Sequence, residues 1–78
     1  MGGHDLLERV VVNPDVCGGA PCIRGTRTEI AVLLDSLAEG MTVEEVLDHF
    51  PHVTRDDVLA AIAYASGLAR ENVWKLAG

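Results

Sequence analysis

The residues best suited to binding chemistry form one short string, Arg24-Gly25-Thr26-Arg27. Two guanidinium groups flank a Gly-Thr step, and a guanidinium carries several N–H donors that match a carboxylate or a phosphate. A helix is expected directly after the string, and the free amides of a helix N-terminus attract anions. The string therefore predicts a site for an anion or for an acidic group of a partner. The alternative is structural: the arginines pair with acidic helices of this chain or of a second copy, while Gly25 and Thr26 form a turn.

A second group of residues would contact DNA if the helical part works as a helix-turn-helix. The recognition helix would then begin at the string Thr54-Arg55-Asp56-Asp57, whose side chains would face the bases. Two carboxylates at this position are repelled by phosphates, and Arg55 alone is a poor reader of sequence. DNA binding is therefore the alternative function, and it needs a dimer. The cations that such a dimer would present are Arg9, Arg24, Arg27 and Arg55.

Cysteine, histidine and serine do not combine into a metal site or a catalytic site. Cys17 and Cys22 with His49 and His52 include the ligand types of a zinc site, but the two histidines straddle an expected helix end and share no face. Four residues separate the cysteines, instead of the two of a redox pair. Both serines lie inside expected helices without a suitably spaced histidine. We therefore expect no metal, no cofactor and no enzymatic activity.

The charge of the chain is unevenly distributed. The 78 residues have a formal net charge of −6, and residues 1–27 are balanced. Residues 28–78 hold three Lys and Arg against nine Asp and Glu. An acidic helical part disfavours broad phosphate contact and suits a basic partner. A chain of this size has room for one small core and not for a cleft between two subdomains, so binding or regulation is expected ahead of catalysis.

The composition and the apolar runs indicate a globular domain. Apolar residues make up 49% and charged residues 23% of the chain. No apolar run approaches the ~18 residues of a membrane span, and the first nine residues lack the pattern of a signal peptide. We expect a cytoplasmic protein with one domain over residues 1–78. Its parts are flexible residues 1–8, a β element and loop over 9–27, a helical bundle over 28–69 and a tail over 70–78.

The N-terminal part predicts two short strands. Arg9-Val10-Val11-Val12 is rich in β-branched residues and stops at Asn13-Pro14. Cys22-Ile23-Arg24 can return as the second strand, and Gly25 can turn the chain towards a helix. Two strands alone are marginally stable, so they must pack on helices or pair with another copy. The second possibility predicts a homodimer.

Three helices are predicted after the β element. Apolar residues at helical spacing from Ile30 to Leu37 give the first, and Gly40 stands at its C-cap. Thr42 and Glu45 form a capping box that opens the second, and Pro51 ends it. The predicted inner faces of these two helices are Ile30, Leu33, Leu34 and Leu37, and Val43, Val46, Leu47 and Phe50.

The third predicted helix begins at Thr54, where Thr54-Arg55-Asp56-Asp57 repeats the capping pattern of Thr42 and Glu45. The acidic residues in its first turn also suit the helix dipole. Its predicted inner stripe is Val58, Leu59, Ile62 and Ala65. Two alternatives stay open at its end, because the helix either stops at Gly67 or continues towards Trp74. Trp74 is a candidate interface residue, and the alternative is that it folds back on the bundle.

The strings together resemble a known family over about residues 9–68. These strings are Asn13-Pro14, Gly18, Pro21-Cys22-Ile23-Arg24-Gly25-Thr26-Arg27, Leu37-Ala38-Glu39-Gly40-Met41-Thr42-Val43-Glu44-Glu45-Val46-Leu47, Phe50-Pro51 and Ala60-Ala61-Ile62-Ala63-Tyr64-Ala65. In this order they resemble the domain-of-unknown-function 433 family. The resemblance implies a compact helix-turn-helix or homeodomain-like domain with a short N-terminal β element, often dimeric. It also implies an antitoxin-like partner of PIN-like toxins.

The fold class predicted for this chain is mainly α. It is a three-helix helix-turn-helix (homeodomain-like) bundle with a short N-terminal two-stranded β element. The predicted function is non-enzymatic binding of a PIN-like toxin nuclease by a homodimer, and the alternative is a dimeric DNA-binding regulator.

Overall fold

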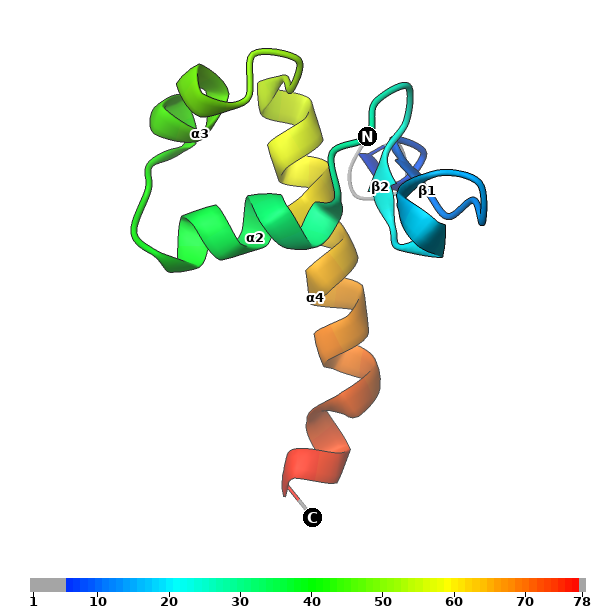
Figure 1. Cartoon of the computed structure of the whole chain (residues 1–78). Helices are drawn as coiled ribbons and strands as arrows, with labels where there is room; N and C mark the ends of the chain where they lie inside the picture. Colours follow the sequence, from blue (N-terminus) through cyan, green and yellow to red (C-terminus); the bar gives the residue numbers. More distant parts are fainter. Residues whose placement is uncertain (1–5, 78) are drawn as a thin grey trace.

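The structure is a computed structural model that describes residues 6–77, with side chains described from residue 6 to residue 71. Strand β1 (Val10–Val11) pairs antiparallel with strand β2 (Cys22–Ile23), and a 3₁₀ turn, η1 (Cys17–Gly19), lies between them. Helices α2 (Ile30–Ala38), α3 (Val43–His49) and α4 (Arg55–Ala77) follow (Figure 1). Within the described residues, the predicted mainly helical fold with three helices and an N-terminal two-stranded sheet is confirmed.

The two-stranded sheet is held against the helices. The register places Val10 opposite Ile23 and Val11 opposite Cys22. Strand β1 contacts α4 and strand β2 contacts α2. Ile23 is buried in the common core, and Val10 packs against that core. A strand pair can be stabilised by packing on helices or by pairing with another copy of the chain. The single chain therefore provides the first of these, packing on helices.

The predicted ends of α2 and α3 are confirmed. Gly40 follows the C-cap of α2 with φ +103°, a conformation that glycine adopts without a Cβ clash. Helix α3 begins with a capping box, in which the Glu45 amide donates to Thr42 Oγ1 at 3.1 Å. The Thr42 amide donates in return to Glu45 Oε1 at 2.8 Å. The short turn between the helices therefore has its exposed amides satisfied.

One core joins all the elements. Helices α2 and α3 contribute the residues that their spacing predicted, because Leu33 and Val46 are fully buried and the remaining predicted positions are buried or pack against the core. The buried cluster consists of Ile23, Ile30, Leu33, Val46, Val53, Val58 and Ala61.

The predicted inner stripe of α4 is wrong at two positions. Leu59 and Ile62 are 41% and 43% exposed. The helix buries Val58 as predicted, together with Asp57, Ala60 and Ala61, so its buried face is rotated relative to the predicted stripe. This rotation follows from its neighbours, because α4 contacts α2, α3 and β1 and turns Asp57 towards the β element.

Helix α4 runs without interruption to Ala77, so the alternative in which it continues past Gly67 is the one the structure adopts. Residues 70–77 are helical, and the boundary expected after residue 69 falls inside one helix. Figure 1 shows the C-terminal half of α4 extending away from the other elements. The side chain of Trp74 lies outside the described part, and so do residues 1–5 of the segment 1–8 that was expected to be flexible. No helix in the described residues is long and apolar enough to cross a membrane.

Candidate partner-binding site

The string that contains Arg24 and Arg27 is the tip of a tight turn. The Thr26 amide donates to the Ile23 carbonyl at 3.0 Å, and the Ile23 amide donates to the Thr28 carbonyl at 2.9 Å. Gly25 has φ +81°, a region that a turn of this kind reserves for glycine. Thr26 Oγ1 donates to the Ile23 carbonyl at 2.8 Å and accepts from the Thr28 amide at 3.0 Å. Gly25 and Thr26 therefore fix the turn, and the two arginines flank it.

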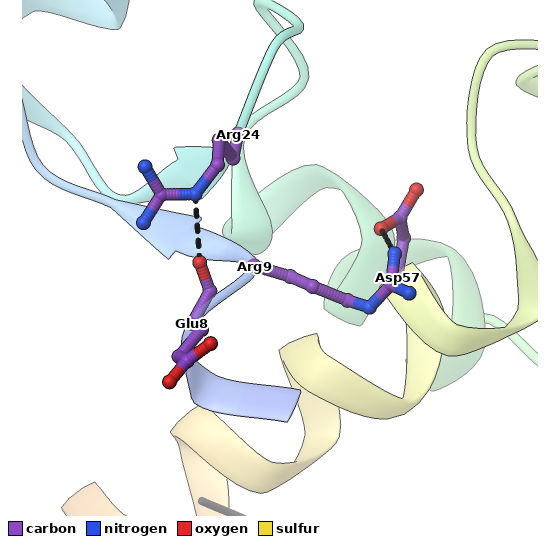
Figure 2. A pocket seen from close by; sticks show the side chains of 4 residues that line it. All are labelled: Glu8, Arg9, Arg24 and Asp57. Carbon is purple, nitrogen blue, oxygen red and sulfur yellow. Dashed lines mark hydrogen bonds and ion pairs between the residues drawn. The ribbon is translucent and has the colours of Figure 1, made fainter. Parts of the chain in front are cut away.

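Arg24 is anchored to the segment that precedes β1. Its backbone amide donates to the Arg9 carbonyl at 2.7 Å, and its Nε donates to the Glu8 carbonyl at 2.8 Å. The two remaining nitrogens point away from Glu8 in Figure 2. The residue borders an open hollow of about 410 Å³, which Glu8, Arg9 and Asp57 also line. The anchored Nε leaves the outer edge of the guanidinium available for a partner.

Arg9, in contrast, is a structural residue. Its Nη1 donates to Asp57 Oδ1 at 3.1 Å, and its Nη2 lies 3.5 Å from Asp56 Oδ2. Asp57 is only 5% exposed, and its second oxygen accepts from the Thr54 amide at 3.0 Å. The Asp57 amide donates back to Thr54 Oγ1, which completes a capping arrangement at the start of α4. Figure 2 shows Arg9 reaching towards Asp57 while Arg24 turns the other way.

Arg27 has no such partner. Its side chain is exposed, and no carboxylate among the described side chains pairs with Arg24 or Arg27. The Arg27 carbonyl accepts from Cys17 Sγ at 3.2 Å, which fixes the backbone and leaves the guanidinium outside. Arg27 borders an open hollow of about 600 Å³ together with Gly25, Thr26 and His52. For these two arginines, internal ion pairing is therefore absent from the described part of the chain.

Arg55 pairs with Glu44 across the α3–α4 corner. The hydrogen bond from Arg55 lowers the pKa of the Glu44 carboxyl below its ordinary value. Both side chains are exposed, so the pair is screened by water. Of the four arginines predicted for DNA contact, Arg9 and Arg55 are thus engaged by carboxylates of their own chain, and Arg24 and Arg27 are not.

The helix after the turn does not offer all the free amides that the sequence predicted. The Ile30 amide donates to the Pro21 carbonyl at 2.9 Å, and the Val32 amide donates to the Glu29 carbonyl at 3.2 Å. An anion at the turn would therefore be held by the guanidinium groups rather than by the α2 terminus. This corrects the expectation that both features act together.

The two cysteines lie beside this turn and are free thiols. Cys22 is buried, and its Sγ lies 3.9 Å from the Thr26 carbonyl. Burial, followed by a hydrogen bond with Cys22, raises the pKa of the Cys17 thiol. Within residues 6–71, no three His, Cys, Asp or Glu side chains gather as metal ligands would.

Sequence reasoning missed the roles of Arg9 and Asp57 in joining the β element to α4. The string Thr54-Arg55-Asp56-Asp57 predicted Asp57 as an acidic residue of a capped first turn, and as part of the helix start that would face DNA. The position of Asp57 three residues after Thr54 is typical of an N-cap, and the structure contains this cap at the start of α4. Nothing in the local pattern indicates that an arginine 48 residues earlier would cover the same carboxylate.

The fold is that of a small helical domain with an N-terminal β element. The turn after β2 presents two arginines, Arg24 and Arg27, that pair with no carboxylate among the described side chains. The sequence places it among known proteins. The model of the family described as Protein of unknown function (DUF433) matches residues 10–65, and the chain belongs to this family.

Two relatives agree with this assignment. An uncharacterized protein, y4eO, from Sinorhizobium fredii is 36% identical over 58 residues. The match covers 74% of this chain and 26% of that protein, so this chain spans about a quarter of its relative. The crystal structure of a DUF433 member from Anabaena variabilis superposes with a TM-score of 0.74 at 28% identity. That match covers 96% of this chain and 74% of the other.

Proposed function

We propose that this chain is a non-enzymatic, cytoplasmic protein-binding domain that acts as the antitoxin-like partner of a PIN-like toxin nuclease. The observation that supports the proposal most directly is the pair Arg24 and Arg27, which flank a fixed turn without a carboxylate partner in the described chain. A nuclease centre built from metal-binding carboxylates is an acidic target for two such guanidinium groups. The domain is proposed to work as a homodimer.

The acidic helices supply the second half of the proposed contact. Carboxylates on α2, α3 and α4 stay exposed while Asp57 alone is buried among the acidic residues of the described part. A nuclease that binds RNA carries a basic surface, which the exposed carboxylates attract over a distance and mask on contact. The exposed acidic residues of the three helices and of the α2 C-cap are Asp35, Glu39, Glu44, Glu45, Asp48, Asp56 and Glu71.

The experiment tests whether the protein encoded next to this chain's own gene is a nuclease that the chain inhibits. Purified chain is expected to bind that nuclease and to block its RNA cleavage. The double variant Arg24→Ala/Arg27→Ala is expected to weaken binding at least tenfold, because both guanidinium contacts are removed. Arg55→Ala, which removes one cation already paired with Glu44, is the control and should bind like the parent chain.

Two outcomes would remove the proposal. One is recovery of no nuclease-like partner from the native host, together with no inhibition of the neighbouring gene product. The other is a double variant that binds and inhibits as the parent chain does. Equal losses in the double variant and in Arg55→Ala would assign the binding to net charge, and the turn would lose its role.

The alternative function, a dimeric DNA-binding regulator, rests on the same two arginines. Arg9 and Arg55 are engaged in ion pairs, so a dimer presents four free cations from Arg24 and Arg27. Binding through these alone predicts that the logarithm of the affinity falls with the logarithm of salt with a slope of about −4. A mobility-shift experiment with the chain's own upstream DNA tests it, and no shift at low salt removes it.

A further inference from the structure

Two thiols lie beside the turn that carries the free arginines, although four residues separate them in the sequence. Cys17 Sγ donates to the Arg27 carbonyl at 3.2 Å. Cys22 Sγ donates to the Thr26 carbonyl at 3.9 Å. The two carbonyls belong to consecutive residues, and the thiols are also in hydrogen-bond contact with each other. The fold therefore assembles a dithiol that the spacing in the sequence did not predict.

The two thiols differ in their access to solvent. Cys22 lies in strand β2 and is 0% exposed, whereas Cys17 is half-buried at the start of η1. An oxidant from solution meets the accessible thiol first, and a second thiol in contact with it can then attack the oxidised sulfur. Cys17 therefore fits the role of the reactive thiol, and Cys22 fits that of the resolving thiol.

The segment around Cys17 has strain to release and room to move. Cys17 has φ +54°, a left-handed backbone that residues other than glycine adopt rarely and at a cost in energy. Gly18 follows with φ +63°, and an added Cβ there would meet no atom within 4 Å. An open hollow of about 540 Å³ borders Val16 in this segment and Arg27 in the turn. Cys17 can therefore move from hydrogen-bond contact with Cys22 to an S–S bond of about 2.05 Å.

We propose that Cys17 and Cys22 form an oxidant-sensitive pair, which a peroxide converts into an intramolecular disulfide that releases the backbone of Arg27. In the first step the Cys17 sulfur attacks one peroxide oxygen, an S–O bond forms, and the O–O bond breaks with loss of one water. In the second step the Cys22 sulfur attacks the Cys17 sulfur, the S–S bond forms, and the sulfenic oxygen leaves as a second water. The two thiols lose two electrons and two protons, and one peroxide is reduced to two water molecules.

The disulfide has no S–H group, so both carbonyls of the turn lose their donors. The loss is greatest at Arg27, whose carbonyl accepts from Cys17 over the shorter of the two distances. Thr26 stays tied to the Ile23 carbonyl through its amide and its hydroxyl. Oxidation therefore frees Arg27 while the rest of the turn stays in place. A freed Arg27 loses more conformational entropy when a partner binds, which weakens the contact, and this consequence rests on the proposed function.

The chemistry of the pair suits a slow and reversible response. Burial raises the pKa of the Cys17 thiol, so little thiolate is present at neutral pH and the first step is slow. In a reducing compartment, disulfides of this kind are transient and occur in redox sensing. The pair therefore responds to sustained oxidant, and thiol reductants restore the hydrogen bond to Arg27.

The first test asks whether the disulfide forms. The reduced full chain is treated with hydrogen peroxide, freed of peroxide, unfolded in the presence of N-ethylmaleimide and digested with trypsin. Cleavage after Arg9 and Arg24 releases a peptide of residues 10–24, which holds both cysteines. Mass spectrometry is expected to find this peptide two hydrogens lighter and without maleimide, and dithiothreitol should restore two maleimide groups. Two maleimide groups after peroxide, a sulfinic acid on Cys17, or a disulfide between chains would each overturn the proposal.

The second test measures the release of Arg27 by limited trypsin digestion of the folded chain. Oxidation is expected to speed cleavage after Arg27 at least threefold, while cleavage after Arg70, in α4, keeps its rate. Cys17→Ala, which lacks the donor, should be cut at the faster rate without peroxide. Cys17→Ser is the matched control, because its hydroxyl keeps a donor and forms no disulfide, so it should be cut slowly with and without peroxide. Equal rates after Arg27 in the oxidised and reduced chain, or equal acceleration after Arg70, would overturn the release of the turn.

A third measurement separates the redox pair from the proposed function. The oxidised chain is expected to bind the nuclease of the proposed function at least threefold more weakly than the reduced chain. Equal binding in the two states would remove the control of binding and leave the nuclease partner in place. A chain that binds no nuclease, yet forms the disulfide and releases Arg27, would remove the proposed function and support the redox pair.

Discussion

The Arg9 guanidinium donates to the buried Asp57 carboxylate over 3.1 Å and joins two residues that are 48 positions apart. Arg9 precedes β1, and Asp57 lies in the first turn of α4. The Arg9 carbonyl also accepts from the Arg24 amide, so the same residue positions the turn with the free arginines. This one contact therefore connects the α4 cap, the sheet and the candidate site.

Removal of the buried carboxylate should destabilise the fold. Asp57→Ala is expected to lower the free energy of unfolding by about 2 kcal/mol, because the Thr54 amide and the Arg9 guanidinium lose their acceptor. Urea denaturation measures the change. Asp56→Ala, whose carboxylate is exposed and 3.5 Å from Arg9, is the control and should cost less than about 0.5 kcal/mol. Similar losses of unfolding free energy in the two variants would contradict the prediction that the buried Asp57 carboxylate contributes more to stability than the exposed Asp56 carboxylate.

The Glu44–Arg55 pair should make stability depend on pH in the acid range. The folded state holds the pKa of Glu44 below its ordinary value of 4.5, so the unfolded state binds the proton more readily. The stabilisation is present above that ordinary pKa and is lost as the pH falls through the folded pKa. Glu44→Gln should therefore be less stable than the parent at pH 7 and equal to it at the acid end.

Thermal unfolding between pH 7 and pH 3 checks this, and added salt should reduce the difference at pH 7. Asp48→Asn is the matched control, since Asp48 is an exposed acid of the same helix with no ion pair among the described side chains. A constant difference between Glu44→Gln and the parent at every pH would contradict the prediction.

Two glycines should respond oppositely to the same substitution. Gly25→Ala places a Cβ on a residue with φ +81° and is expected to cost about 1–2 kcal/mol, although no atom lies within 4 Å of that Cβ. Gly67→Ala lies inside α4, where a Cβ also meets no atom, and should gain about 0.5–1 kcal/mol. Chemical denaturation of both variants tests the pair. Equal signs would show that one of these backbone conformations is wrong.

The Cys17 thiol should react slowly at neutral pH. Burial and the hydrogen bond with Cys22 raise its pKa, which lowers the thiolate fraction available to an alkylating reagent. Alkylation by iodoacetamide at pH 8 is expected to be slower in the folded chain than in urea, and to speed up above pH 9. Mass spectrometry of the modified peptide assigns the site. Equal rates in the folded and unfolded chain would show that the folded state leaves this thiol unperturbed.

Local patterns in the sequence were sufficient for most of the elements. The capping box of Thr42 and Glu45, the glycine after α2 and the apolar spacing of α2 and α3 each depend on residues within one or two helical turns. Such short-range patterns predict a helix and its ends because the hydrogen bonds concerned are local. The short strands at Val10 and Cys22 were also recognisable from their β-branched residues and turn residues.

The sequence also showed how the net charge is distributed, with a neutral N-terminal part and acidic helices. It identified Arg24 and Arg27 as the candidate binding residues, and it left open whether they pair internally. It misplaced Leu59 and Ile62 in the core, because a stripe of apolar spacing does not say which side of a helix meets its neighbours.

Tertiary structure decided which arginines form ion pairs within the chain and which face of α4 is buried. The pairing of Arg9 with Asp57 and of Arg55 with Glu44 depends on which segments meet in space, which no local pattern records. The same contacts rotate α4, leave one apolar face exposed, and leave Arg24 and Arg27 without a carboxylate in the described chain. The sequence by itself determined the elements and their capping, since those interactions span a few residues. The tertiary structure decided which charged side chains form ion pairs within the chain and which stay available to a partner, because ion pairs depend on contacts between residues far apart in the chain.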